Sequence, residues 1–151
     1  MANTQAIATS FKSEMLSGIH ALGVTVVRGA TTVDTLKAAL YLASGSQGAA
    51  TTAYSATNEV SGTGYTAGGV TVTNATAPSS TGTTAFWTPS ASFVWTGVTL
   101  ATAFDCVTVY NSTQANRAIS VHTFGALTVT AGNFSLTMPS NDSTNGLVRF
   151  A

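Results

Sequence analysis

From residue 24 onward the chain consists of short segments in which apolar and polar residues alternate. In 35–43 the even-numbered positions are Leu or Ala and share one face, whereas Lys37, Ala39 and Tyr41 share the other. Alternation of this kind predicts a β-strand with one buried face. Similar segments, separated by Gly, Pro, Ser and Asn, are 24–28, 69–74, 83–88, 92–100, 104–111, 118–124, 127–130, 134–138 and 147–150. The spacing predicts a mainly β fold, an antiparallel β-sandwich or jelly roll.

The first segment has a different period and predicts an α-helix. Its apolar side chains recur every fourth residue, at Ile7, Phe11, Met15 and Ile19. A helix buries such a stripe on one side. Asn3 or Thr4 is a suitable N-cap, and Gly23 is suited to the C-terminal end. We expect residues 1–23 to form a helical lid on the core or an arm that reaches a neighbour, and 24–151 to form a single β-sandwich domain.

The alternation also identifies a core. Apolar residues on the inward faces of the expected strands should be mostly buried. They are Leu40, Leu42, Val70, Val72, Phe93, Trp95, Val107, Val109, Ile119, Val121, Leu127, Val129, Phe134, Leu136 and Met138.

The chain carries very little charge. Charged residues make up 7% of it, the formal net charge is zero, and an average domain is about 25% charged. The basic residues are scattered and form no basic stripe, so we expect no nucleic-acid partner. No segment reaches the roughly 20 apolar residues of a membrane span. Little electrostatic repulsion keeps copies apart, so we expect a homo-oligomer.

No residue pattern points to catalysis, a metal or a cofactor. The two histidines, His20 and His122, are distant in sequence and show no metal-ligand spacing with Cys106, the single cysteine. We expect all three to be structural. The glycine-rich run 61–69 precedes an alternating segment, whereas a phosphate-binding loop precedes a helix. We therefore expect a non-enzymatic protein.

Several segments resemble small virion structural proteins of tailed bacteriophages. They are Lys-Ala-Ala-Leu-Tyr-Leu-Ala at 37–43, the run 59–69, Ala-Phe-Asp-Cys-Val at 103–107, and 129–134 leading into Met138-Pro139. The resemblance covers about Lys37 to Ala151. It implies a non-enzymatic virion component, and we expect a capsid decoration or cement protein that binds the major capsid protein as a homotrimer. The alternative position is the tail or neck, as a collar, fibre or adaptor-associated component.

Apolar and aromatic residues are the candidate partner contacts. They are Phe11, Met15, Tyr54, Tyr65 and Trp87. Exposed aromatic rings also stack on sugars, so a surface carbohydrate-binding module is a further alternative, with Tyr110 added to the aromatic set. The N-terminus has no positively charged segment followed by an apolar one, and we expect synthesis in the host bacterial cytoplasm and a final location in the virion.

Overall fold

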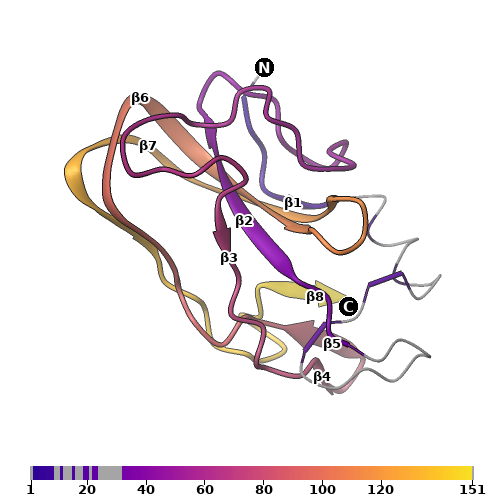
Figure 1. Ribbon diagram of the computed structural model, residues 1–151. Helices are drawn as coiled ribbons and strands as arrows, with labels where there is room; N and C mark the ends of the chain where they lie inside the picture. The colour runs from indigo at the N-terminus through magenta and orange to yellow at the C-terminus, as the bar shows by residue number, and fades with distance from the viewer. Residues whose placement is uncertain are drawn as a thin grey trace.

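The structure, a computed structural model, describes residues 2–8, 11, 15, 19–20, 22–23 and 32–150, and its strands form two antiparallel sheets (Figure 1). The five-stranded sheet has the order β1-β7-β6-β2-β3, with β1 (Ala6–Ile7), β7 (Arg117–Leu136), β6 (Phe93–Asn111), β2 (Leu36–Leu42) and β3 (Val70–Thr71). The three-stranded sheet has the order β4-β5-β8, with β4 (Ser79–Thr81), β5 (Thr84–Trp87) and β8 (Val148–Phe150). The predicted mainly β, sandwich-like class is confirmed.

The jelly-roll arrangement is not formed by the described strands. A jelly roll has eight strands in two Greek keys. Here β6 and β7 follow one another in the chain and pair along almost their whole lengths at the centre of the larger sheet. The fold is therefore built around one long hairpin.

This hairpin replaces five of the predicted strands. The sequence predicted breaks at 101–103, 125–126 and 131–133, but β6 and β7 continue through them with shifts of register between Trp95 and Cys106. Gly97 (φ +61°) and Ala131 (φ +45°) have the left-handed backbone conformation within this stretch. Bulges bend a strand without ending it. In Figure 1 the paired strands accordingly extend beyond the other strands of the larger sheet, curve at the upper left and run down toward the smaller sheet.

The N-terminal segment begins as a strand, which corrects the predicted start of the helix. Ala6 and Ile7 pair with Val121 and Ser120 of β7. Asn3 is not an N-cap, because its side-chain amide donates to the Leu42 carbonyl at 2.9 Å. The same amide donates to Asp105 Oδ1 at 2.6 Å. The remainder of the predicted helix lies largely outside the described residues, and the predicted strand at 24–28 lies wholly outside them.

Another correction concerns the first strand of the smaller sheet. Pro78-Ser79-Ser80 lies between the expected strands 69–74 and 83–88, where Pro and Ser predict a turn. Instead Ser79–Thr81 forms β4 and pairs with β5. All three residues of β4 are exposed, so no apolar alternation announces the strand.

The main core lies between the two sheets, and most of its predicted members are buried. Nine predicted residues are confirmed as buried. Eight of them, Leu40, Val72, Phe93, Trp95, Val107, Val109, Ile119 and Phe134, belong to this core, and Val121 belongs to a second apolar cluster. Six are only half-buried: Leu42, Val70, Leu127, Val129, Leu136 and Met138. Further fully buried members include Phe11, Leu36, Trp87, Val98, Leu100 and Phe104.

β2 is buried on both faces, so the prediction of a single buried face is wrong. Ala39 and Tyr41 are fully buried and belong to a second apolar cluster with Cys106, Tyr110 and Val121. The connection between β2 and β3 supplies Tyr54, which packs against this cluster. Central strands covered on both faces lose the alternation that a half-exposed strand shows.

Candidate functional site

The structure divides the predicted contact residues between two places. Phe11 and Trp87 are buried in the main core, and Met15 is half-buried against it. Met15 and Trp87 line a small apolar hollow of about 60 Å³ together with Phe150, whose ring lies 5.9 Å from that of Phe11. Tyr54 packs against the second apolar cluster, on the other face of the larger sheet, and Tyr65 packs against the main core. Their hydroxyls meet at Glu59, a residue that the sequence pattern did not indicate.

The Glu59 cluster is formed by Glu59 and the four tyrosines of the chain, Tyr41, Tyr54, Tyr65 and Tyr110. Tyr54 donates its hydroxyl hydrogen to Glu59 Oε2 at 2.7 Å. Tyr65 donates to Glu59 Oε1, also at 2.7 Å. The Gly68 amide donates to that same oxygen at 2.7 Å. One carboxylate thus accepts hydrogen bonds from three groups in the connection between β2 and β3.

The remaining tyrosines tie this connection to the sheet. Tyr41 of β2 donates to the Ser55 carbonyl at 2.8 Å, and Tyr110 of β6 donates to the Gly68 carbonyl at 2.7 Å. The rings of Tyr54 and Tyr110 stack with centroids 4.8 Å apart. Every hydroxyl in the cluster is therefore bonded within the chain.

Burial governs the acidity of these groups. Desolvation, followed by the hydrogen bond to Glu59, raises the pKa of Tyr54 to about 12. Desolvation also raises the pKa of Tyr110 to about 12, with a smaller effect from the Glu59 charge. The pKa values of Tyr41 and Tyr65 are raised too, mainly by burial. The four tyrosines are protonated at neutral pH, and their hydrogen bonds hold the connection between β2 and β3 against the larger sheet.

Gly69 shows why the glycine run 61–69 has its composition. Its φ is +72°, and a Cβ there would overlap the Ala38 carbonyl oxygen of β2. Only glycine accepts both constraints without strain. The same run has two further glycines with positive φ, Gly64 and Gly68, as turns between strands require.

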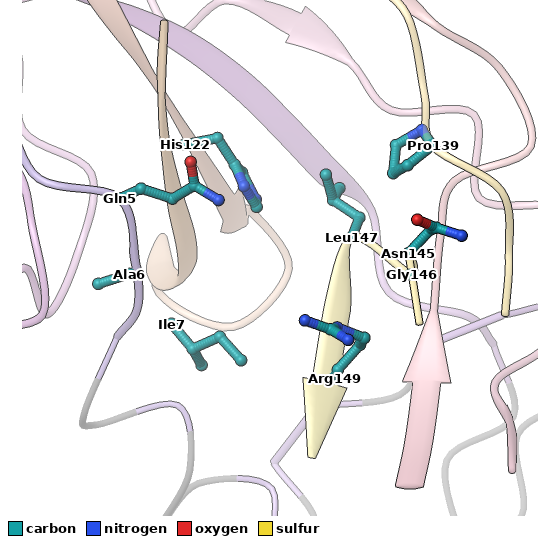
Figure 2. Close-up of a pocket in the computed structure, with 9 residues that line it drawn as sticks. All are labelled: Gln5, Ala6, Ile7, His122, Pro139, Asn145, Gly146, Leu147 and Arg149. Atoms are coloured by element: carbon teal, nitrogen blue, oxygen red, sulfur yellow. The ribbon is translucent and has the colours of Figure 1, made fainter. Parts of the chain in front are cut away.

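The larger cavity lies on the opposite side of the fold, between the edge strands β1 and β8 (Figure 2). We call it the β1–β8 cleft. Its volume is about 440 Å³, and it is lined by Gln5, Ala6, Ile7, His122, Pro139, Asn145, Gly146, Leu147 and Arg149. Figure 2 shows the side chains of Gln5 and His122 on one side of the opening and those of Asn145 and Arg149 on the other. Gln5, Asn145 and Arg149 supply amide and guanidinium donors, so the opening is polar.

His122 forms the inner wall of the β1–β8 cleft. Its Nε2 lies 2.8 Å from the Ser120 hydroxyl, and the two roles in this hydrogen bond depend on the tautomer. A Ser–His pair of this kind resembles part of a hydrolase triad. Here Ser120 is fully buried, so a substrate carbonyl does not reach its oxygen. Burial lowers the pKa of His122 to about 4, and the imidazole is neutral at pH 7.

The other groups that the sequence flagged are enclosed. His20 is 5% exposed, and its Nδ1 lies 3.1 Å from Asn111 Nδ2. Cys106 is fully buried, and desolvation raises the pKa of its thiol to about 12. Within the described residues, no three His, Cys, Asp or Glu side chains are grouped so that they could hold a metal ion. The described part of the chain contains no helix long and apolar enough to cross a membrane.

Comparison with known proteins yields no relative for this chain: no family model, no curated protein and no solved structure matches it.

Proposed function

We propose that the protein is a non-enzymatic structural component of a bacteriophage virion, a capsid decoration protein that binds the major capsid protein. The observation that carries this proposal is the uncharged surface of the bent half of the β6–β7 hairpin, residues 94–104 and 123–136, which we call the arch. These two ranges contain no Asp, Glu, Lys or Arg. The sequence resemblance to phage virion proteins agrees with this role.

Small side chains cover most of the exposed part of the arch, and the other exposed residues there are Val94, Asn133 and Ser135. In β6 they are Thr96, Gly97, Ala101, Thr102 and Ala103, and in β7 they are Gly125, Ala126, Thr128, Thr130 and Ala131. Burying such a surface against another protein removes no charge from water, which is the most expensive kind of desolvation. Hydroxyl and backbone groups remain available for hydrogen bonds across the interface.

Binding at several identical sites makes the overall binding tight. A modest interface becomes tight when copies are linked and bind a symmetric lattice at several points. A homotrimer placed on the threefold positions of a capsid meets this condition.

The carbohydrate-binding alternative has less support. It needs aromatic faces exposed to the ligand. Trp87 and Tyr110 are each 2% exposed, and the hydroxyls of Tyr54 and Tyr65 are bonded to Glu59. Their rings belong to the core and to the Glu59 cluster rather than to an open platform.

The test is the copy number of the protein in purified virions, measured by quantitative mass spectrometry against the major capsid protein. A decoration protein should be present on the order of hundreds of copies per particle, whereas a neck or tail component should number about a dozen to a few dozen. Absence from the particle overturns the virion proposal.

A variant of the arch tests the contact surface itself. Thr128→Glu places a charge on the exposed arch and should weaken rebinding to heads that lack the protein by roughly tenfold or more, because the carboxylate must be desolvated. Thr81→Glu, on exposed β4, is the matched control and should bind like the parent protein. Equal binding of both variants would contradict the assignment of the arch as the contact.

A further inference from the structure

The β1–β8 cleft is bounded by the edges of two different sheets. Within the described residues, β1 pairs only with β7, and β8 pairs only with β5. Ala8 donates its amide hydrogen to the Ile119 carbonyl, so the alternation of an antiparallel ladder turns the backbone groups of Ile7 away from β7. Unpaired edge groups of this kind bind an added extended chain.

The opening of the cleft carries one positively charged side chain. Arg149 is the one charged residue that lines it, and its side chain is exposed. One of its nitrogens donates to the Ser143 carbonyl at 3.3 Å, which leaves most of the five guanidinium hydrogens for a ligand. The nearby Asp142 carboxylate accepts hydrogen bonds from Thr144 and Asn145, and it also interacts electrostatically with Arg149.

An apolar cavity adjoins the cleft on its inner side. It has a volume of about 130 Å³ and shares His122 and Leu147 with the cleft as lining residues. Its other walls are Phe93, Val107, Thr123, Phe124, Leu136, Thr137 and Met138. A protein cavity of about 150 Å³ takes up benzene, so this inner cavity is the size of one large apolar side chain.

We infer that the β1–β8 cleft binds an extended peptide segment of a partner protein, in which a large apolar residue stands within one or two positions of an acidic residue. The apolar side chain enters the inner cavity, the carboxylate pairs with Arg149, and the peptide backbone adds to a strand edge. The strand edges favour a peptide over a small amphiphile, because they offer hydrogen bonds that only a polypeptide backbone can match along its length. The inference does not depend on the position of the protein in a particle.

The test starts from a random decapeptide library displayed on yeast and selected against the full-length protein. Enriched peptides should combine a large apolar residue with a neighbouring Asp or Glu. A soluble copy should bind with a Kd on the order of 1–100 μM, as measured by fluorescence polarisation. Failure to enrich any such sequence overturns the inference, whatever the copy number in virions turns out to be.

Two substitutions at exposed positions localise the binding. Arg149→Gln should raise the Kd of the selected peptide about tenfold, because one charge-assisted hydrogen bond is lost. Thr137→Phe narrows the inner cavity and should raise the Kd of the peptide by roughly tenfold or more. The controls are Lys37→Gln, which removes a charge from β2, and Ser135→Phe, which adds a ring to exposed Ser135 of β7. Both controls should keep the affinity within about twofold.

Two further outcomes contradict the inference. One is a selected peptide whose affinity is the same for Arg149→Gln, Thr137→Phe and the controls, because it then binds elsewhere. The other is binding of dodecanoate that both cleft substitutions weaken while no peptide is enriched, which would make the occupant a small amphiphile. Melting curves of all four variants establish that each is folded before its affinity is compared.

Discussion

The Glu59 cluster and the β1–β8 cleft use similar polar groups in opposite ways. In the cluster, one carboxylate receives three hydrogen bonds, and the tyrosine hydroxyls all find partners within the chain. In the cleft, the amide of Gln5 has no hydrogen-bond partner among the described residues, and Arg149 uses one donor. The polar groups of the cluster stabilise the fold, whereas those of the cleft face solvent.

The difference lies in what covers each part of the larger sheet. The long connection between β2 and β3 folds back over the face that carries Tyr41 and Tyr110. Between β1 and the β8 edge of the other sheet lies a cavity of about 440 Å³. Substitutions in the cluster should therefore change stability, and substitutions at the rim of the cleft should change binding.

High pH should produce the largest effect and should act on the Glu59 cluster. Below about pH 10 the tyrosines are protonated in both the folded and unfolded chain, so the stabilisation is complete. Above it the unfolded chain releases protons that the folded chain keeps, because burial raises the tyrosine pKa values, to about 12 for Tyr54 and Tyr110. Stability should fall by up to roughly 1.4 kcal/mol per pH unit for each buried tyrosine, and by less for the more exposed Tyr54.

Urea unfolding between about pH 8 and 11.5, with tyrosinate absorbance followed in parallel, measures this loss. The absorbance should rise together with unfolding. Tyr41→Phe removes one of the titrating groups and should make the alkaline loss of stability shallower. Tyrosines that ionise near their usual pKa of about 10 while the protein stays folded would contradict the account of the cluster.

Glu59→Ala should have the next largest effect. It leaves the Tyr54 and Tyr65 hydroxyls and the Gly68 amide without their acceptor, and the free energy of unfolding should fall by about 2–4 kcal/mol. Glu59→Gln keeps one carbonyl acceptor and should cost less than the alanine variant. Urea unfolding at pH 7 measures both. A fall in the free energy of unfolding below about 0.5 kcal/mol for Glu59→Ala, as at an ordinary surface site, would show that the cluster does not stabilise the fold.

The sequence predicts best those strands that have one buried and one exposed face. In 93–95, where Val94 is exposed, alternation correctly placed Phe93 and Trp95 in the core. It failed for β4, which is exposed throughout, and for the second face of β2. The pattern also predicted strand ends at the bulges of β6 and β7, because small residues and glycine are common at both features.

The candidate sites were harder to predict because their residues meet only in the fold. Glu59 and Tyr65 are close in sequence, and their spacing in the run 59–69 could have suggested a local hydrogen bond. Nothing local joins them to Tyr110. The cleft pairs Gln5, near the start of the chain, with Arg149, near its end. Isolated residues of this kind carry no pattern until the strands that hold them are placed.

His122 allows the smallest of the three effects to be measured on the cleft side. Burial lowers its pKa to about 4, so between that value and the usual 6.5 the unfolded chain binds a proton that the folded chain refuses. Its contribution to stability is therefore complete above pH 6.5 and is lost as the pH falls toward 4. The loss should be on the order of 1–3 kcal/mol.

His122→Gln keeps a polar group beside Ser120 but does not titrate, so the difference between its stability and that of the parent protein should shrink as the pH is lowered. Urea unfolding of both proteins at pH 7, 6, 5 and 4 measures that difference, and a constant difference would mean that His122 is as well solvated in the folded protein as in the unfolded chain.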